Sequence, residues 1–286
     1  MSSQVPIRVG AAIPSATAPD RVTQFRRRYL GAFLVASLLL VLWQSLRIIL
    51  QLPAYKLPDP LSIVGEFAAT RPSGELVAVS LGRDLLITWW EAALGFALGA
   101  TAGVAMAIVF TRSRVLQRGL LPYVVMSQTI PILAIAPMVV VGVGQMGAPA
   151  LLSKAMIAAY LTFFPVSINT LRGLQSVEPD ALDLMRSFAA GERDSYLKLR
   201  IPHAVPYIFT ALKLSATASV IGAIVAELPV GSNEGIGSAL INGAQYNTFQ
   251  PAYLWATIIT AAVLGLLFYT VVALVERRVV TWRVGE

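Results

Sequence analysis

The sequence lacks cysteine altogether, contains a single histidine and has few charged residues. Without cysteine, the chain forms no disulfide, no thiolate metal site and no cysteine nucleophile. A lone histidine, His203, excludes a histidine-rich metal site, and its place beside Pro202 favours a structural role. Charged residues make up 13% of the 286 residues, against roughly 25% in a typical soluble domain. The sequence therefore predicts an integral membrane protein.

Motifs for catalysis and nucleotide binding are also missing. The chain has no G-x-x-x-x-G-K-[ST] phosphate-binding loop and no serine in a G-x-S-x-G turn. Paired carboxylates are lacking within the apolar segments. We therefore expect that the protein is not an enzyme, and that it holds neither a metal nor a cofactor of its own.

What the sequence does have is a series of apolar segments, each near the ~20 residues needed to cross a bilayer. They predict an all-α integral membrane protein with six transmembrane helices in one domain, residues 30–286. Residues 1–29 are polar and contain proline, which predicts a disordered tail. The six predicted spans are 30–50, 85–110, 120–144, 150–171, 204–228 and 252–275.

Lysine and arginine are distributed very unevenly between the segments that join the spans. With the N-terminus inside, the inner segments hold sixteen of them, and the outer segments hold Lys56, Arg71 and Arg83. The positive-inside rule then places both termini in the cytoplasm. Because this topology accounts for the net charge of +7, we expect no nucleic-acid partner.

The loop at residues 172–203 is the longest charge-rich interval after the N-terminal tail. Pro179 suits the first position of a short helix, whose apolar residues recur at three and four positions. We expect Gly191 to end this helix. A second short helix, at about 193–199, is expected to stop at Ile201-Pro202, because a residue before proline avoids the helical region. An ordinary amphipathic surface helix is the alternative interpretation.

The spacing in this loop resembles the cytoplasmic EAA loop of permease subunits of ATP-binding-cassette (ABC) importers. Asp183-Leu184-Met185 stand at its Glu-Ala-Ala, Ala189 at its glycine, Leu199 at its isoleucine and Ile201-Pro202 at its Leu-Pro. The alanines and the glycine of the motif are replaced here. The run Ile130-Pro131 to Pro137 is similar to the nitrate/sulfonate/taurine-type permeases. These features identify the chain as resembling a type I, binding-protein-dependent importer permease.

The resemblance implies a six-helix type I importer permease in a bacterial inner membrane. Its implied partners are a second permease copy, giving a homodimer, two cytoplasmic subunits that bind ATP-Mg, and an extracytoplasmic solute-binding protein. The implied ATPase-coupling residues are Asp180, Asp183, Leu184, Met185, Phe188, Ala189, Ala190, Gly191, Arg193, Ile201 and Pro202.

The substrate implied by the resemblance is a small organic solute or an oxyanion. A thiamine-precursor or pyrimidine type and a sulfonate, nitrate or taurine type both remain open, with a slight preference for an organic solute. The alternative function is an ion-gradient-driven secondary transporter, which requires titratable residues near the middle of the membrane.

Two features suggest a translocation path. Prolines interrupt the third span and free backbone carbonyls, although a simple kink at a packing site is the alternative. In the fifth span, small and polar residues share a stripe that ends at Glu227, which we expect to face the path or its outer gate. The predicted path residues are Ser127, Gln128, Thr129, Pro131, Ser219 and Glu227.

The second span carries Gly95, Gly99 and Gly103 on the same stripe as Glu91. Glycines at this spacing let a second helix approach closely, so we predict a packing face. Glu91 needs either water at the outer end of the span or a partner, and Lys213 is expected to reach the cytoplasmic surface. Residues 238–246 are expected to form a short surface helix, similar to a gate-like helix of the family.

Overall fold

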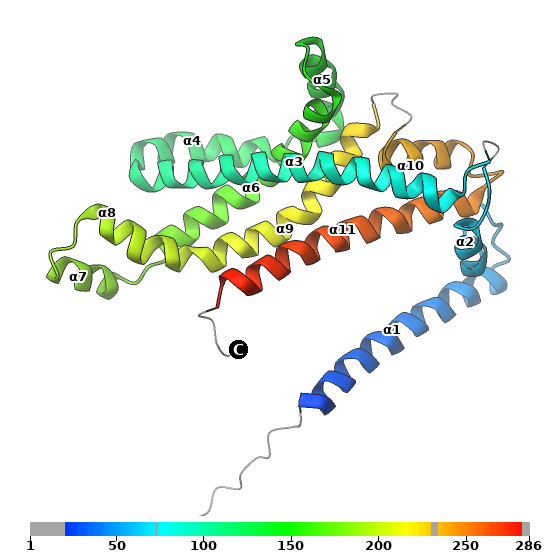
Figure 1. Cartoon of the computed structure of the whole chain (residues 1–286), viewed down its shortest axis with the longest axis horizontal. Helices are drawn as coiled ribbons and strands as arrows, with labels where there is room; N and C mark the ends of the chain where they lie inside the picture. Colours follow the sequence, from blue (N-terminus) through cyan, green and yellow to red (C-terminus); the bar gives the residue numbers. More distant parts are fainter. Residues whose placement is uncertain (1–20, 72–73, 230–233, 282–286) are drawn as a thin grey trace, which may run out of the picture. The chain divides into compact units, whose positions relative to one another are not determined.

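The computed structural model describes residues 21–71, 74–229 and 234–281, and these residues are almost entirely helical (Figure 1). Outside the helices, the described residues contain one isolated β-bridge, between Thr70 and Leu76. The chain divides into two compact units, Met1–Pro53 and Ala54–Glu286. The all-α prediction is therefore confirmed.

The described part of the first unit is dominated by one helix, α1 (Arg21–Ile49). This helix begins within the predicted tail of residues 1–29, and residues 1–20 lie outside the described residues. No proline follows Pro19 until Pro53, so no residue in between interrupts the backbone hydrogen bonds. The apolar part of α1, Phe33–Ile49, is shorter than the ~20 residues of a typical span.

The second unit is a helical bundle in which α3 packs on α6, α6 on α9 and α9 on α11 (Figure 1). Helices α7 and α8 lie at one end of this bundle, and α2 and α10 lie at the other. We call these the α7 end and the α10 end. The helices of the unit are α2 (Pro60–Glu66), α3 (Val77–Arg112), α4 (Arg114–Ser127), α5 (Ile132–Gln145), α6 (Ala150–Gln175), α7 (Pro179–Ser187), α8 (Glu192–Ser195), the π-helix η1 (Tyr196–Arg200), α9 (Ile201–Glu227), α10 (Ile236–Gln245) and α11 (Pro251–Val279).

Four helical elements among the described residues are long and apolar enough to cross a membrane: α3, α6, α11 and the continuous segment Glu192–Glu227. The predicted third span is divided into α4 and α5, which meet at a bend of 100°. Pro131 has no N–H to donate, and it disfavours a helical Ile130, so α4 cannot continue into α5. The structure thus supports four spans, or five if the bent pair counts as one.

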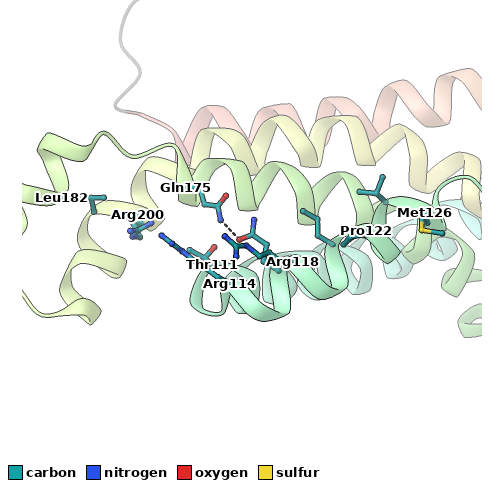
Figure 2. Close-up of a pocket in the computed structure, with 11 residues that line it drawn as sticks. Thr111, Arg114, Arg118, Pro122, Met126, Gln175, Leu182 and Arg200 are labelled. Atoms are coloured by element: carbon teal, nitrogen blue, oxygen red, sulfur yellow. Dashed lines mark hydrogen bonds between the residues drawn. The ribbon is translucent and has the colours of Figure 1, made fainter.

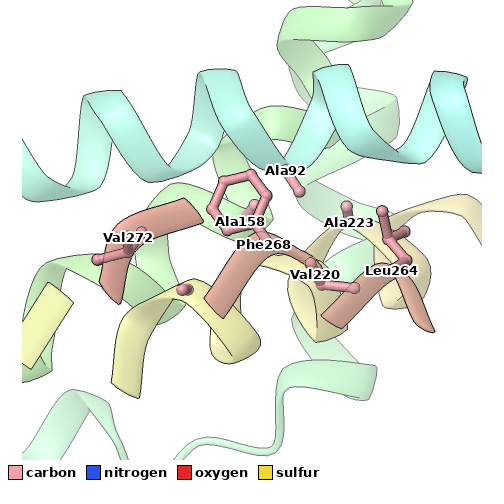
Figure 3. Close-up of a cluster of buried hydrophobic side chains, with 8 residues drawn as sticks. Ala92, Ala158, Val220, Ala223, Leu264, Phe268 and Val272 are labelled. Atoms are coloured by element: carbon pink, nitrogen blue, oxygen red, sulfur yellow. The ribbon is translucent and has the colours of Figure 1, made fainter. Parts of the chain in front are cut away.

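Small side chains let the bundle helices pack closely around one aromatic ring (Figure 3). Phe268 of α11 lies edge-on to Trp89 and Phe96 of α3, with ring centroids 4.9 and 5.4 Å away. The other members of this buried cluster are Ala92, Ala158, Ala216, Val220, Ala223, Leu264 and Val272. The bundle core therefore combines alanine contacts between α3, α6 and α9 with larger residues of α11.

The glycine stripe of α3 lies directly against α6. A Cβ atom added at Gly95 would be 2.4 Å from the Cβ of Ala158, and one at Gly99 would be 2.3 Å from the carbonyl oxygen of Ala159. At Gly103 the nearest atom, the carbonyl oxygen of Phe163, would be 2.9 Å away. These separations leave no room for a side chain, so α3 and α6 can approach this closely only with glycine at these positions.

Candidate functional site

Helix α7 begins at Pro179, as expected, but it ends differently from the prediction. The N–H groups of Ala189 and Ala190 donate to the carbonyl oxygens of Arg186 (2.9 Å) and Met185 (3.0 Å), which is a Schellman cap. Ala189 adopts a left-handed backbone with φ of 53°. The prediction that Gly191 ends this helix is wrong, since Gly191 instead precedes the first residue of α8. The left-handed residue is the one that stands at the glycine of the EAA motif.

The predicted stop at Ile201-Pro202 is also wrong. Helix α8 passes through η1 into α9 without a break, and the N–H of Ile201 donates to the carbonyl oxygen of Tyr196, five residues earlier. Proline lacks an N–H and its ring crowds the carbonyl four residues before it. The wider π-turn makes room for Pro202, so the helix continues to Glu227.

Helices α7 and α8 and the residues between them, 179–195, are called the α7–α8 loop below. Its surface presents two apolar side chains among charged ones. Leu184 and Phe188 are 58% and 75% exposed and lie one helical turn apart. Asp183 pairs with Arg186 at 2.8 Å, and both side chains are exposed to solvent. The remaining predicted coupling residues fall into an exposed group, Asp180, Ala189, Gly191 and Arg193, and a half-buried group, Met185, Ala190, Ile201 and Pro202.

At the α10 end, side chains from α3 and α9 satisfy the free N–H groups of α10. The N–H of Gly235 donates to Asp84 (3.0 Å), that of Ile236 to Thr88 (2.9 Å) and that of Gly237 to Glu227. The hydroxyl of Thr88 also donates to Glu227, at 2.6 Å. Carboxylates are favourable at a helix N-terminus, where backbone N–H groups have no partner within the helix. We call these three acceptor side chains the α10 clamp.

The clamp requires glycine at two positions of α10's first turn. Gly235 has φ of 94°, and a Cβ atom there would be 2.2 Å from Oε1 of Glu227. A Cβ atom at Gly237 would be 2.4 Å from the carbonyl oxygen of Ile224. Glycine at these two positions therefore permits the close approach of α10 to α9.

A buried ion pair lies one helical turn from the clamp. Nζ of Lys154 on α6 is 2.7 Å from Oε1 of Glu91 on α3, and the two side chains are only 4% and 3% exposed. Glu91 is three residues from Thr88 and therefore on the same face of α3. The expectation that the apolar segments lack paired carboxylates is wrong, because the buried carboxyl groups of Glu91 and Glu227 lie close enough to interact with each other. Glu91 is therefore paired with Lys154, and does not reach water at the outer end of the span.

The second oxygen of Glu91, Oε2, is buried without a hydrogen-bond partner within the described residues. Buried charges are costly unless paired, so this region of the core depends on Lys154. Nothing local in the sequence indicated Lys154, which is 63 residues from Glu91. The polar residues of α3 could have been found from the sequence, because Asp84, Thr88 and Glu91 are spaced by four and three residues. They therefore lie on the same helix face as the glycine stripe.

The predicted path residues form two separate groups. Ser127 ends α4, Gln128 and Thr129 lie in the bend, and Pro131 precedes α5. Ser219 and Glu227 are instead buried within α9, at 0% and 1% exposure. In the described part of the chain, no hydrogen bond joins the two groups. Their contribution to a path remains a prediction.

The bend itself has two unusual polar groups. Tyr160 of α6 donates its hydroxyl proton to the carbonyl oxygen of Ser127, while Nε2 of Gln128 is buried with no partner among the described residues.

Lys213 on α9 pairs with Glu276 on α11 at 2.6 Å, rather than only reaching toward a surface. Within the described ranges, no three His, Cys, Asp or Glu side chains lie close enough together to hold a metal ion.

A second surface feature occupies the α10 end. A cavity of about 460 Å³ lies between residues of α2, α10 and α11, and Tyr246 and Phe249 on its rim are 60% and 85% exposed. Burial raises the pKa of Glu66 in its wall, and the nearby charge of Arg71 partly opposes that rise. The two ends of the bundle thus each expose aromatic or apolar side chains near charged ones.

Comparison with protein families matches residues 99–281 to the family described as binding-protein-dependent transport system inner membrane component. A putative aliphatic sulfonates transport permease protein of Bacillus subtilis (strain 168) is 32% identical over 90% of both chains. A formylaminopyrimidine transport permease protein of Halalkalibacterium halodurans is 30% identical over 86% of this chain and 93% of its own. A nitrate import permease protein of Leptolyngbya laminosa is 29% identical over 76% of this chain and 81% of its own.

Among solved structures, the chain resembles one titled "Crystal structure of an amino acid ABC transporter with histidines". The TM-score is 0.56 and the identity 22%, and the match covers 71% of this chain and 95% of the other. At this identity the likeness concerns the fold.

Proposed function

The chain belongs to the family of binding-protein-dependent transport system inner membrane components, and from this we propose that it is the permease subunit of an ATP-driven ABC importer. It is a multi-pass protein of the bacterial plasma membrane and a transport permease, not an enzyme. In this proposal the chain forms the solute path, and separate subunits bind and hydrolyse ATP-Mg.

One observation carries the coupling role. Leu184 and Phe188 project from a loop at one end of the bundle, and this loop continues without a break into the helix that ends at Glu227. An exposed apolar pair surrounded by charges is the usual composition of a contact centre with a polar rim. We propose that residues 180–202 dock into the ATPase subunit and that α9 transmits its movement.

The remaining assembly follows from the same proposal. A second copy of the chain completes the path as a homodimer, and each copy carries one ATPase subunit at its α7 end. Both termini then lie in the cytoplasm with the α7 end. The solute-binding protein docks at the α10 end, where Tyr246 and Phe249 are exposed.

For the substrate we propose a small organic solute or an oxyanion. Relatives named for aliphatic sulfonates, formylaminopyrimidine and nitrate all match most of this chain, and their names span both classes. The basic groups Lys154 and Lys213 are both neutralised by glutamates, which weakens the case for an anion held directly by this chain. Competition between these three solutes for uptake is the direct test.

Two phenylalanines offer a matched test of the coupling surface. Phe188→Ala should weaken binding of the ATPase subunit by about tenfold or more, since a central aromatic side chain commonly contributes over 1–2 kcal/mol to an interface. Phe249→Ala removes another exposed ring, at the opposite end, and should leave ATPase binding unchanged. Affinity is measured by co-purification and by titration in detergent, and Asp183→Lys serves as a second variant in the loop.

Reconstituted transport separates this function from its alternative. We expect uptake to require ATP, and Phe188→Ala to uncouple ATP hydrolysis from uptake. Equal ATPase binding by both phenylalanine variants would contradict the assigned docking surface. Uptake that persists without ATP but collapses with the ion gradient would instead establish a secondary transporter.

A further inference from the structure

A cavity of about 930 Å³ opens at the α7 end, between α4, the end of α6 and η1 (Figure 2). Three arginines, Arg114, Arg118 and Arg200, contribute to its wall, and no carboxylate does. An amide hydrogen bond of 3.1 Å from Gln175 to Gln117 crosses between α6 and α4 beside them. The cavity therefore gathers positive charge from two separate parts of the chain.

These guanidinium groups have unused hydrogen-bonding capacity. Arg114 and Arg118 are four residues apart on one face of α4, and their side chains make no ion pair or hydrogen bond with any described residue. Arg200 donates from Nη1 to the carbonyl oxygen of Leu174 at 3.0 Å, which leaves other N–H donors free. Planar guanidinium groups match the oxygens of a phosphate particularly well.

The same face of α4 becomes apolar beyond Arg118. Leu121 and Val125 follow it at three and seven residues, and Pro122 and Met126 complete this part of the wall. Figure 2 shows the arginines toward one end of the cavity and Pro122 and Met126 toward the other. A ligand that fits both parts has an anionic head and a hydrocarbon chain.

We propose that this cavity binds an anionic phospholipid. The phosphate lies between Arg114, Arg118 and Arg200, and an acyl chain follows Leu121, Val125 and Met126. Basic pockets between membrane helices are a recognised way to hold anionic headgroups. Leu182 of α7 also lines the cavity, so the lipid reaches the α7–α8 loop. This inference goes beyond the transport function and depends only on the chain being in a membrane.

Native mass spectrometry of the full-length chain in mild detergent tests the proposal. The probes are dioleoyl phosphatidylglycerol, dioleoyl phosphatidylcholine and inorganic phosphate. We expect the wild type to retain phosphatidylglycerol in preference to phosphatidylcholine. Arg114→Gln/Arg118→Gln should reduce this preference by about thirtyfold, because each arginine near an anionic headgroup contributes about fivefold.

The matched control is Arg172→Gln/Arg277→Gln. It removes two exposed arginines from the ends of α6 and α11, outside this cavity, and should keep the preference. Met126→Asp keeps all three arginines and should weaken binding of both lipids, without changing any binding of inorganic phosphate.

Several outcomes would overturn the proposal. Equal retention of the two lipids by the wild type excludes an anionic site. An equal loss in both double variants shows that net charge, not this cavity, determines the preference. Displacement of the lipid by millimolar inorganic phosphate would show that the arginines bind a free anion and not a lipid headgroup. If Arg114→Gln/Arg118→Gln separates two copies of the chain while the lipid ratio stays constant, the cavity is a contact between copies.

Discussion

Ala189 shows at the scale of one residue why the EAA motif has a glycine at this position. Its φ of 53° lies in the left-handed region, which costs a residue with a Cβ atom about 1–2 kcal/mol. The Schellman hydrogen bonds of α7 hold it there. The sequence departs from the motif here, but the backbone retains the conformation that glycine allows.

Ala189→Gly should therefore stabilise the α7–α8 loop. Glycine relieves the left-handed strain and loses part of that gain to its greater freedom when unfolded. We expect the amide of Ala190 to exchange with solvent about two- to fivefold more slowly, measured by hydrogen–deuterium exchange. Ala190→Gly, at the next residue with negative φ, is the control and should not slow exchange.

The Glu91–Lys154 pair gives a second prediction for single residues. Lys154→Met should destabilise the protein by about 3–5 kcal/mol, because it leaves the charge of Glu91 buried without a partner. Glu91→Gln/Lys154→Met should recover most of that loss. The free energy of unfolding is measured by denaturant titration of the chain in detergent.

The exposed pair Arg83–Glu75 is the control for this cycle. Its arginine side chain is 66% exposed, so Arg83→Met should cost no more than about 1 kcal/mol. Equal costs for Lys154→Met and Arg83→Met would show that burial does not decide the contribution of the Glu91–Lys154 pair.

At the scale of the helical element, the contact between α3 and α6 depends on the glycine stripe. Gly99→Ala should destabilise the protein by about 1–3 kcal/mol, because its Cβ atom would overlap the backbone of Ala159. Gly82→Ala lies in the same helix with no atom within 4 Å of its Cβ position. That control should be neutral or stabilising by up to about 1 kcal/mol, as expected for alanine in a helix. Thermal unfolding in detergent distinguishes the two.

Sequence periodicity was sufficient to predict the long helices, but not their interruptions and continuations. Apolar length indicated α3, α6, α9 and α11, because the bilayer sets the length of a span. The presence of a proline did not predict whether a helix breaks there, because Pro131 accompanies a 100° bend whereas Pro202 lies inside a continuous helix. The difference comes from the π-turn before Pro202, and no residue pattern in the sequence indicated that turn.

At the scale of the whole bundle, the α10 clamp joins three helices at one end. Its acceptors come from α3 and α9, and its donors are consecutive N–H groups at the start of α10. Sequence reasoning selected Glu227 as a path or gate residue but not its partners, since Asp84 and Thr88 lie about 140 residues earlier. Partners this distant are brought together only by the packing of the bundle.

Glu227→Gln tests the importance of the clamp for transport. The amide keeps one acceptor oxygen, but its NH2 group cannot accept, so one of the two hydrogen bonds that Glu227 accepts from Thr88 and Gly237 is lost. We expect amide exchange in the first turn of α10 to rise about tenfold and ATP-driven uptake in proteoliposomes to fall. Thr217→Ala is the control, because the hydroxyl of Thr217 donates to the carbonyl oxygen of Leu214 in its own helix. Unchanged uptake by Glu227→Gln would remove Glu227 from the path or gate.

The π-turn η1 also sets the rotation about the helix axis between the two ends of the continuous segment Glu192–Glu227. Each residue of an α-helix turns the chain by about 100°, so one residue added or removed reorients everything beyond it. A π-turn accommodates one extra residue, and here it lies between the exposed loop and the helix that carries Glu227. Conversion of η1 to regular α-helix would therefore rotate Glu227 relative to Phe188 about the axis of this helix.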